Sequence, residues 1–228
     1  MATTLHEQLK QHYVRCSDRH EILLDGFRID AIDGRRRLVE IQCASLSSIR
    51  SKIRHLLRSH RVIVVKPLAS YKLIIRQSAR DGPVLSSRTS PLHQGLFHVF
   101  QDLVHFVDVF PHPRLRLDVL LTHQEEVRIP PTGRSSWKKN YRVDDRRLIC
   151  VEQQTRLSTP HELWASLNLT VGAEFTTVEL AESAGMPLWL ARKAAYCFRL
   201  MNYFDVCGRR GRLVVYRLSD GQRRGRAA

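Results

Sequence analysis

The clearest pattern of apolar and polar positions lies in residues 26–42 and just beyond. Apolar residues alternate with polar ones in two halves, at Phe27, Ile29 and Ala31 and again at Val39, Ile41 and Cys43. Alternation with a period of two is typical of half-buried β-strands. Asp33-Gly34 between the halves is a strong turn signal, so the pattern predicts an antiparallel hairpin.

The register of this hairpin decides which side chains share a face. Opposed residues of an antiparallel pair lie on one face, and the two apolar sets meet only when opposed residue numbers add up to an even value. This requires a loop with an odd number of residues. A loop over 33–37, for example, sets Asp30 opposite Glu40, with Gln42 further along the same face. The pattern therefore predicts that these three polar side chains gather together.

Asp30 and Glu40 have two readings. Carboxylates one strand spacing apart repel each other unless a cation lies between them, and Mg²⁺ prefers oxygen ligands of this kind. On a hairpin whose second face meets solvent, the same residues are instead ordinary solvated positions. Both readings stay open on the residues alone.

Helical and strand-like spacing continues on both sides of the hairpin. Apolar spacing predicts helices over 3–14 and 44–60, and short apolar runs predict strands over 20–24, 62–65 and 71–75. The second helix carries basic residues on its other face, at Arg50, Lys52, Arg54 and Arg58. Such a face either holds a phosphate backbone or lies in solvent.

The middle of the chain is less regular. Residues 76–90 are rich in Gly, Pro, Ser and Arg and predict a connector, followed by a helix over 92–110 and strands over 115–127 and 147–153. The basic loop over 134–142 contains Trp137, Lys138 and Lys139. A tryptophan among cations either stacks on bases or closes its loop onto a core.

The last third of the chain combines short helices with a basic hairpin. Thr159-Pro160 predicts the start of a short helix, Gly185 predicts a turn, and Pro187 predicts the start of another helix. The buried side of this last helix is predicted to consist of Leu190, Ala194, Cys197, Phe198 and Met201. Residues 206–218 then alternate around Gly208-Arg209-Arg210-Gly211. The order of helix, glycine turn, helix and basic hairpin resembles a winged helix-turn-helix domain.

This resemblance implies nucleic-acid-binding residues in addition to Arg50, Arg54 and Arg58. On the last helix they are Arg192, Lys193, Tyr196 and Arg199, which would reach a major groove. At the hairpin tip they are Arg209, Arg210 and Arg212, which would reach an adjacent phosphate or minor groove. Winged helices also dock proteins, so the fold alone does not decide the partner.

The charge of the chain favours a nucleic-acid partner. Lys and Arg number 37 against 22 Asp and Glu, which gives a net charge of +15. Most of the excess is arginine, whose planar group binds phosphate through two hydrogen bonds, and it clusters in 35–61 and 208–228. A genome-wide arginine bias on solvated faces is the alternative explanation. With 228 residues, 43% of them hydrophobic, the chain is long enough for a proper core.

The five cysteines occur singly and without a Cys-x-x-Cys pair, which predicts reduced core thiols of a cytosolic protein. No charged segment followed by an apolar stretch opens the chain, and no run approaches the roughly 18 apolar residues that span a bilayer. We therefore expect a soluble cytoplasmic protein without a membrane partner. The oligomeric state stays open, with a homodimer among the options.

The order of elements around the hairpin resembles the core of the PD-(D/E)XK, or restriction-endonuclease-like, nuclease superfamily. The matching residues are Asp30 for the first acid, Glu40 for the second, and Gln42 where the superfamily most often has lysine. The resemblance covers roughly residues 1–76. It implies Mg²⁺ or Mn²⁺ held by Asp30, Glu40 and the backbone carbonyl of Ile41, with Glu7 of the first helix as a further acid.

The resemblance also implies catalytic roles. Gln42 would orient the attacking water, and Lys52 would supply the positive charge that the usual lysine gives, with Lys66 as an alternative source. Because a neutral amide lacks that charge, two functions stay open. The chain is either a metal-dependent nuclease acting on DNA or a DNA-binding or regulatory protein whose nuclease-like core no longer cuts. A protein-interaction scaffold is a third option.

Together these observations predict an α/β (α+β) protein. Its parts are a restriction-endonuclease-like mixed sheet flanked by helices, a further α+β segment and a C-terminal winged helix. The predicted boundaries are 1–80 for the nuclease-like core, 81–157 for the middle region, 158–219 for the winged helix and 220–228 for a disordered basic tail.

Overall fold

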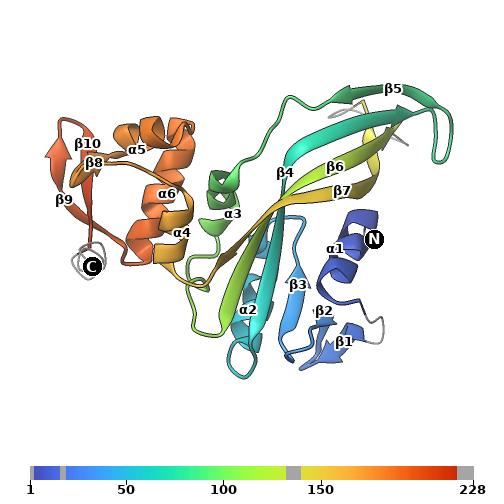
Figure 1. Cartoon of the computed structure of the whole chain (residues 1–228), viewed down its shortest axis with the longest axis horizontal. Helices are drawn as coiled ribbons and strands as arrows, with labels where there is room; N and C mark the ends of the chain where they lie inside the picture. The colour runs from blue at the N-terminus through green and yellow to red at the C-terminus, as the bar shows by residue number, and fades with distance from the viewer. Residues whose placement is uncertain (1–2, 16–18, 132–139, 220–228) are drawn as a thin grey trace. The chain divides into compact units, whose positions relative to one another are not determined.

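The computed structural model of the chain describes residues 3–15, 19–131 and 140–219. These residues form an α+β structure with a mixed multi-strand sheet and helices, which confirms the predicted class at this level (Figure 1). The chain divides into two compact units. The first consists of Met1–Cys43, Val65–Gly95 and Leu120–Gln154, and the second of Ala44–Val64, Leu96–Val119 and Thr155–Ala228.

The larger sheet takes its strands from most of the chain. Within the described residues the strand order is β1-β2-β3-β4-β6-β7, and β5 pairs with β4. The strands are β1 (His20–Leu24), β2 (Phe27–Ile32), β3 (Leu38–Ile41), β4 (Val62–Gln77), β5 (Val84–Thr89), β6 (Leu115–Ile129) and β7 (Arg142–Leu157). The long strands β4, β6 and β7 each contribute residues to both units.

The hairpin of β2 and β3 has the predicted register. Ala31 of β2 pairs with Val39 of β3, so the next opposed pair is Asp30 and Glu40. The loop between the strands covers residues 33–37, as predicted. The buried side of the hairpin consists of Ile29, Ala31, Val39 and Ile41, each at most 4% exposed.

Asp33 holds this loop in place. Its carboxylate accepts hydrogen bonds from the backbone N–H groups of Arg35 (2.9 Å) and Arg37 (2.9 Å) and from Nε of Arg37 (2.8 Å). Burial raises the pKa of Asp33, but these donors outweigh burial and hold the pKa below its ordinary value. An aspartate that binds backbone groups two and four residues ahead stabilises a tight turn, so the loop length and the register are set locally.

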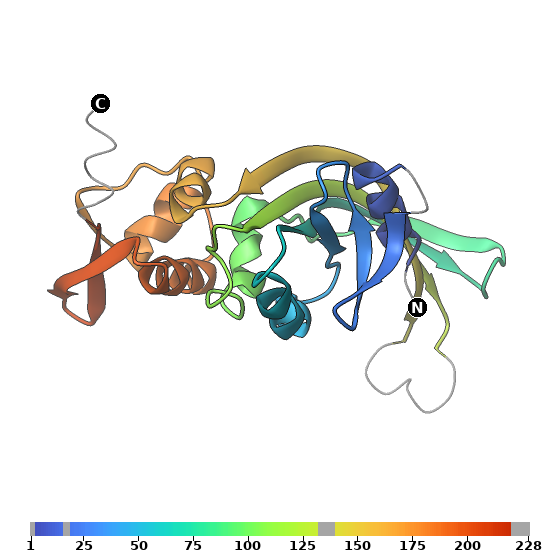
Figure 2. The same cartoon turned by 90° about the horizontal axis from the view of Figure 1, so that it is seen from below.

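Helix α1 (Thr4–Tyr13) belongs to the first unit and lies against β2 and β3 (Figure 2). Leu5 and Leu9, two residues of the predicted apolar stripe, are buried. The helix is also tied to β7, because the backbone N–H of Leu148 donates to the side-chain oxygen of Gln8 (2.7 Å). Residues on α1 can therefore reach the face of the sheet that carries Asp30.

The second unit contains helices from the middle and the end of the chain. They are η2 (Leu46–Ile49), α2 (Arg50–Leu56), η3 (Leu96–Val99), α3 (Phe100–Leu103), α4 (Pro160–Ser166), α5 (Thr177–Ala184) and α6 (Leu188–Leu200). A smaller sheet in this unit has the order β8-β10-β9 and consists of β8 (Glu174–Thr176), β9 (Phe204–Arg210) and β10 (Leu213–Leu218).

Local capping explains where α4 and α5 begin and where α5 ends. Thr159 and Thr176 each accept a hydrogen bond from the backbone N–H of a glutamate three residues on, Glu162 and Glu179, whose carboxylates bind back. Gly185 ends α5 in the left-handed conformation, with φ 59°. The aromatic core next to these helices consists of Trp164, Phe175, Phe198, Tyr203 and Phe204.

Two predictions in the sheet are wrong. The strands predicted over 62–65 and 71–75 are a single strand, β4, which is buried without a break from Val62 to Ala69. The connector predicted over 76–90 contains β5, which pairs with β4 as a hairpin. Every residue of β5 is exposed. The segment therefore has a composition typical of a loop, although its backbone forms a strand.

The helix predicted over 92–110 is mostly absent. Backbone hydrogen bonds from Phe106 to Leu103 (2.8 Å) and from Val109 to Phe106 (2.9 Å) span three residues, which winds the chain into tight turns after α3. Phe100, Leu103, Phe106 and Phe110 are nevertheless buried. The predicted apolar stripe was Leu96, Phe100, Leu103 and Val107, of which Leu96 and Val107 are only half-buried. The apolar spacing therefore predicted the burial in part and the backbone conformation wrongly.

The two units differ from the predicted boundaries at 80/81 and 157/158, since β5, β6 and β7 of the predicted middle region join β4 in one sheet. Trp137, Lys138 and Lys139 of the basic loop and the tail over 220–228 lie outside the described residues.

The cysteines agree with one part of their prediction. Within the described ranges, Cys43, Cys150, Cys197 and Cys207 are free thiols, but Cys150 and Cys207 are exposed, so the prediction of core positions is wrong for these two. No helix in the described part of the chain combines the length and the apolar character that crossing a membrane requires.

Candidate functional site

Acidic side chains from three neighbouring strands lie at one level of the sheet in the first unit. Asp30 on β2 is opposite Glu40 on β3, and opposed residues share a face. Glu21 on β1 lies level with Asp30, because its neighbours His20 and Ile22 pair with Ala31 and Ile29 of β2. Gln42 follows β3, and its backbone N–H donates to the carbonyl of Val65 on β4 (2.9 Å).

The carboxylate of Asp30 is held from two sides. Its Oδ2 accepts a hydrogen bond from the backbone N–H of Ile41 (2.7 Å) and lies 3.2 Å from Nε2 of His6 on α1. The Asp30 side chain is 13% exposed, and Glu40 is 7% exposed. The reading of these acids as solvated positions of an exposed face is therefore wrong.

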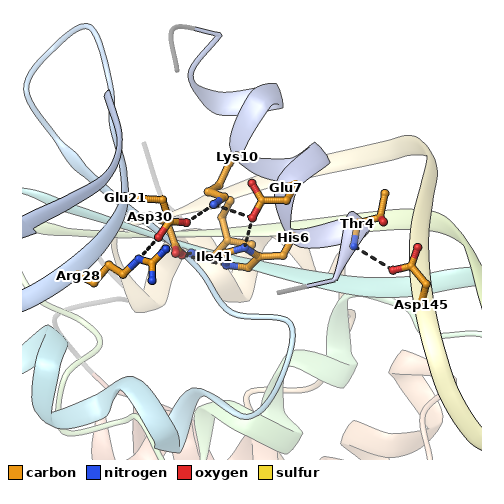
Figure 3. Close-up of polar contacts among 9 residues, drawn as sticks. All are labelled: Thr4, His6, Glu7, Lys10, Glu21, Arg28, Asp30, Ile41 and Asp145. Atoms are coloured by element: carbon orange, nitrogen blue, oxygen red, sulfur yellow. Dashed lines mark hydrogen bonds and ion pairs between the residues drawn. The ribbon is translucent and has the colours of Figure 1, made fainter. Parts of the chain in front are cut away.

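His6 connects α1 to this acidic face (Figure 3). Its hydrogen bond with Asp30 raises the pKa of His6 above the ordinary 6.5, with the charges of Asp30 and Glu7 acting in the same direction. Burial and the nearby charge of Lys10 act against this shift without cancelling it. Protonated His6 and ionised Asp30 therefore form an ion pair that persists to a higher pH than free histidine would allow.

Lys10, one turn further along α1, brings a second positive charge to this face. It is 1% exposed, its ammonium lies 2.8 Å from Oε1 of Glu7, and it also pairs with Glu21, which pairs with Arg28 in turn (Figure 3). Burial lowers the pKa of Lys10, but the hydrogen bonds with Glu21 and Glu7 outweigh burial and raise it. Burial likewise raises the pKa of Glu21, and Lys10 and Arg28 reverse that shift.

Asp30 and Glu40 together suit a divalent ion as an oxygen donor pair. Mg²⁺ is commonly held by one or two carboxylates, with water in the remaining positions. Among the residues that the structure describes, no group of three or more His, Cys, Asp and Glu side chains is arranged to hold a metal ion. An ion at this face would therefore rely on the two carboxylates and would compete with His6 for Asp30. Glu7, named as a further acid, is half exposed and pairs with Lys10.

The lysines named as sources of positive charge lie in different units. Lys52 is on α2 in the second unit, whereas Asp30 and Glu40 belong to the first. Lys66 is 4% exposed and directly follows Val65 in the first unit. With Lys10, it gives the acid-bearing unit two buried lysines.

The basic residues predicted on a helix over 44–60 belong to the second unit, where Arg50, Lys52 and Arg54 lie on α2 and Arg58 follows its end at Leu56. Arg50, Arg54 and Arg58 are exposed. Arg54 forms an ion pair with Asp108. Part of this positive charge is thus neutralised within the unit.

Helix α6 exposes the residues that were predicted to contact DNA. Arg192, Tyr196 and Arg199 are exposed, and Lys193 is half-buried. Lys193 lies over the ring of Trp189 and Arg199 over the ring of Tyr196, each 5.8 Å from the ring centroid. Because Trp189 is itself 47% exposed, the outer face of α6 offers cations interleaved with flat aromatic rings.

The hairpin of β9 and β10 carries the other predicted arginines. Arg210 pairs with Leu213 across the turn, where Gly211 has a φ of 61°. Arg209 and Arg212 are exposed. Arg210 is also exposed, but it forms an ion pair with Glu179 of α5 (2.9 Å), so part of its charge is neutralised within the fold.

No sequence prediction included His6 or Lys10. The two residues are four apart and therefore lie on one face of α1, and each directly follows a residue of the buried stripe, Leu5 or Leu9. This spacing was the sequence pattern that could have identified His6 and Lys10 as neighbours on α1. It could not reveal which strand the helix would cover, so it could not connect His6 with Asp30.

Replacing His6 with Ala is expected to cost stability mainly on the acid side of neutrality. Because the folded-state pKa of His6 is raised, its contribution is fully present below 6.5 and is lost as the pH rises through the folded-state pKa. A hydrogen bond between charged groups contributes about 1.5–3 kcal/mol. Urea unfolding at pH about 5.5 and about 8.5 measures the difference. Exposed His105→Ala is the control, and an equal penalty for His6→Ala at both pH values would contradict the prediction.

Comparison with known proteins adds a family but no activity. The model of a family described as a domain of unknown function, DUF8091, matches residues 3–158, the segment from α1 through β7. The chain is also similar to an uncharacterized protein of Treponema pallidum (strain Nichols), with 27% identity over 219 residues, 94% of this chain and 84% of that protein. No solved structure matches the chain.

Proposed function

We propose that this chain, which belongs to the DUF8091 family, binds DNA and hydrolyses its phosphodiester bonds with Mg²⁺ or Mn²⁺ at Asp30 and Glu40. The observation that carries the proposal is the register of β2 and β3, which sets these two carboxylates opposite each other on a largely buried face. Such a pair needs a cation nearby, and a divalent ion suits its oxygens.

The order of elements supports the proposal. Helix α1, strands β1 to β3, α2 and β4 follow one another along the chain, and the strands are neighbours in the order β1-β2-β3-β4. This resembles the PD-(D/E)XK core, with Asp30 on the second strand and Glu40 on the third. The segment from α4 to β10, with its sheet order β8-β10-β9, resembles a winged helix, whose last helix would be α6.

The residues of the first unit would have different roles in hydrolysis. Asp30 and Glu40 would hold the ion, which when bound activates a water molecule and neutralises charge on the phosphate. Lys10 and Lys66 would contribute the positive charge that Gln42 lacks, and Gln42 would orient the water. Protonated His6 pairs with the carboxylate of Asp30 and would compete with the metal ion for it. The rate of hydrolysis should therefore increase as the pH rises through the folded-state pKa of His6.

Cleavage of plasmid and branched DNA in Mg²⁺ and in Mn²⁺ tests the proposal. Asp30→Asn and Glu40→Gln are each expected to lower the rate roughly 100-fold or more, because each removes one anionic ligand and little volume. Asp25→Asn, at an exposed position in the turn between β1 and β2, is the matched control and should keep the rate. Absence of cleavage by the unchanged chain on every DNA and with both metals would exclude hydrolysis.

DNA binding without cleavage is the second candidate function. The observation that favours it is that His6 and the N–H of Ile41 already bind Oδ2 of Asp30. In this case the unchanged chain and Asp30→Asn shift DNA equally in gels, and neither cuts. DNA binding that is absent at low salt, or that does not weaken as salt increases, would contradict both candidates.

A further inference from the structure

A second charged cluster in the first unit surrounds Glu126 on β6, which is 3% exposed. Its Oε1 accepts hydrogen bonds from Nε (2.8 Å) and Nη2 (2.6 Å) of Arg128. Its Oε2 lies 3.3 Å from the ammonium of Lys72 on β4 and 3.1 Å from Nε of Arg146 on β7. Three cations thus share one carboxylate, and two positive charges are left in excess.

This excess charge is only partly hydrated. The side chains of Arg128, Lys72 and Arg146 are 15%, 18% and 36% exposed. In the described part of the chain, Glu126 is the carboxylate with which all three pair. Charges removed from water without a counter-charge are unfavourable, so the cluster favours binding of an external anion.

Two of the three cations line a cavity of about 210 Å³. Its polar lining residues are Lys72, Arg146, Gln94, Gln124 and Cys43. A water molecule in the liquid occupies about 30 Å³, so the cavity has room for a group of several non-hydrogen atoms. It is smaller than the roughly 300–1,000 Å³ of pockets that enclose a drug-sized ligand.

The cavity offers donors for such an anion. Arg146 uses Nε toward Glu126, and within the described residues its two terminal amino groups donate to no protein acceptor. The side-chain oxygen of Gln94 accepts from the N–H of Ala69 (2.9 Å), which leaves the amide NH₂ for a ligand. Burial raises the pKa of Cys43 to about 11, so the thiol adds no negative charge.

We propose that this cavity binds a phosphate dianion, either a free small phosphate or the terminal phosphate of a DNA strand. The two excess positive charges match the charge of a phosphate monoester, which is about −1.5 to −2 at neutral pH. A guanidinium with free amino groups is suited to its oxygens. A single carboxylate would neutralise only half of the excess. The DNA end as ligand rests on the proposed function, whereas the phosphate site itself does not.

Binding of inorganic phosphate, compared with chloride at equal ionic strength, tests the site. We expect phosphate to raise the thermal midpoint of the unchanged chain, because a ligand of the folded state stabilises it. Arg146→Gln and Lys72→Gln should each weaken phosphate binding roughly tenfold or more. Arg147→Gln is the matched control: this residue is next to Arg146, is exposed and pairs with Asp145.

Titration followed by ³¹P NMR measures the affinity directly, even where a variant has a changed thermal midpoint. Equal affinity in Arg146→Gln, Lys72→Gln and the unchanged chain, or no phosphate binding at all, would overturn the proposal.

DNA duplexes with 5′-phosphate, 3′-phosphate or hydroxyl ends identify the source of the phosphate. Tighter binding of a phosphate-ended duplex that is lost in Arg146→Gln and kept in Arg147→Gln supports a DNA end as ligand. Phosphate binding without any end preference supports a small phosphate. Both binding measurements can be made with Asp30→Asn, which leaves the cavity residues unchanged, so neither result depends on cleavage. Failure of the proposed hydrolysis would therefore not contradict the phosphate site.

Discussion

Reversing two charges on α6, with Arg192→Glu and Arg199→Glu in one variant, is expected to weaken DNA binding about 100-fold or more at low salt. Both arginines are exposed, and Arg199 lies over the ring of Tyr196. Each would form a charged hydrogen bond worth about 1.5–3 kcal/mol, where about 1.4 kcal/mol is tenfold. The slope of log affinity against log salt should become shallower by about 2, since each phosphate contact accounts for about 0.9. Fluorescence anisotropy across a salt series measures both.

The matched control separates the face of α6 from net charge. Arg76→Glu with Arg88→Glu changes the charge by the same amount at exposed positions of β4 and β5. This control should keep most of the affinity, with a smaller loss from weaker long-range attraction. Equal losses in the two double variants would mean that overall charge, and not α6, determines binding.

The hairpin of β2 and β3 was predictable because several local signals agree. Alternation with a period of two specifies strands, Asp33-Gly34 specifies the turn, and burial of the apolar side requires an odd loop. The capped helices near the C-terminus were predictable for the same reason. Thr159, Thr176 and Gly185 act within a few residues of their own position, so no knowledge of distant contacts is needed.

The middle of the chain was less predictable because its conformation depends on distant partners. β5 has the composition of a loop and is a strand only because β4 pairs with it. Residues 92–110 have helical apolar spacing, yet bonds such as that from Phe106 to Leu103 tighten the backbone, while Phe100 and Leu103 of the predicted set stay buried. A pattern of apolar positions specifies which side chains are buried more securely than it specifies the backbone that buries them.

The candidate site was half predictable for related reasons. Asp30 and Glu40 lie on one hairpin, so their opposition follows from local register. His6 reaches Asp30 from α1, and predicting this contact would have required knowledge of helix packing. The cluster at Glu126 could not be predicted from the sequence, because Lys72 and Arg146 come from strands far apart along the chain. The net charge predicted a basic surface, whereas these cations line a cavity.

Replacing Glu126 with Gln is expected to lower the free energy of unfolding by about 3–5 kcal/mol near neutral pH, because three partly buried cations lose the carboxylate that they share. Burial raises the pKa of Glu126, but Arg128, Lys72 and Arg146 outweigh burial and lower the pKa from 4.5 to about 2. Because the folded-state pKa is depressed, this stabilisation is present above pH 4.5 and is lost as the pH falls through about 2. Urea unfolding near neutral pH and at pH about 3 should therefore show a large and a reduced difference from the unchanged chain.

Glu125→Gln is the matched control for this variant, because the neighbouring side chain is half-buried and the charge change is the same. Phosphate should restore part of the stability lost in Glu126→Gln, since Lys72 and Arg146, the two cations of the cluster that line the cavity, have then lost their shared carboxylate. It should have little such effect on the control. A Glu126→Gln protein as stable as Glu125→Gln would mean that the three cations are well hydrated. In that case their charge would no longer favour an anion in the cavity, so this measurement bears on the phosphate site as well as on the fold.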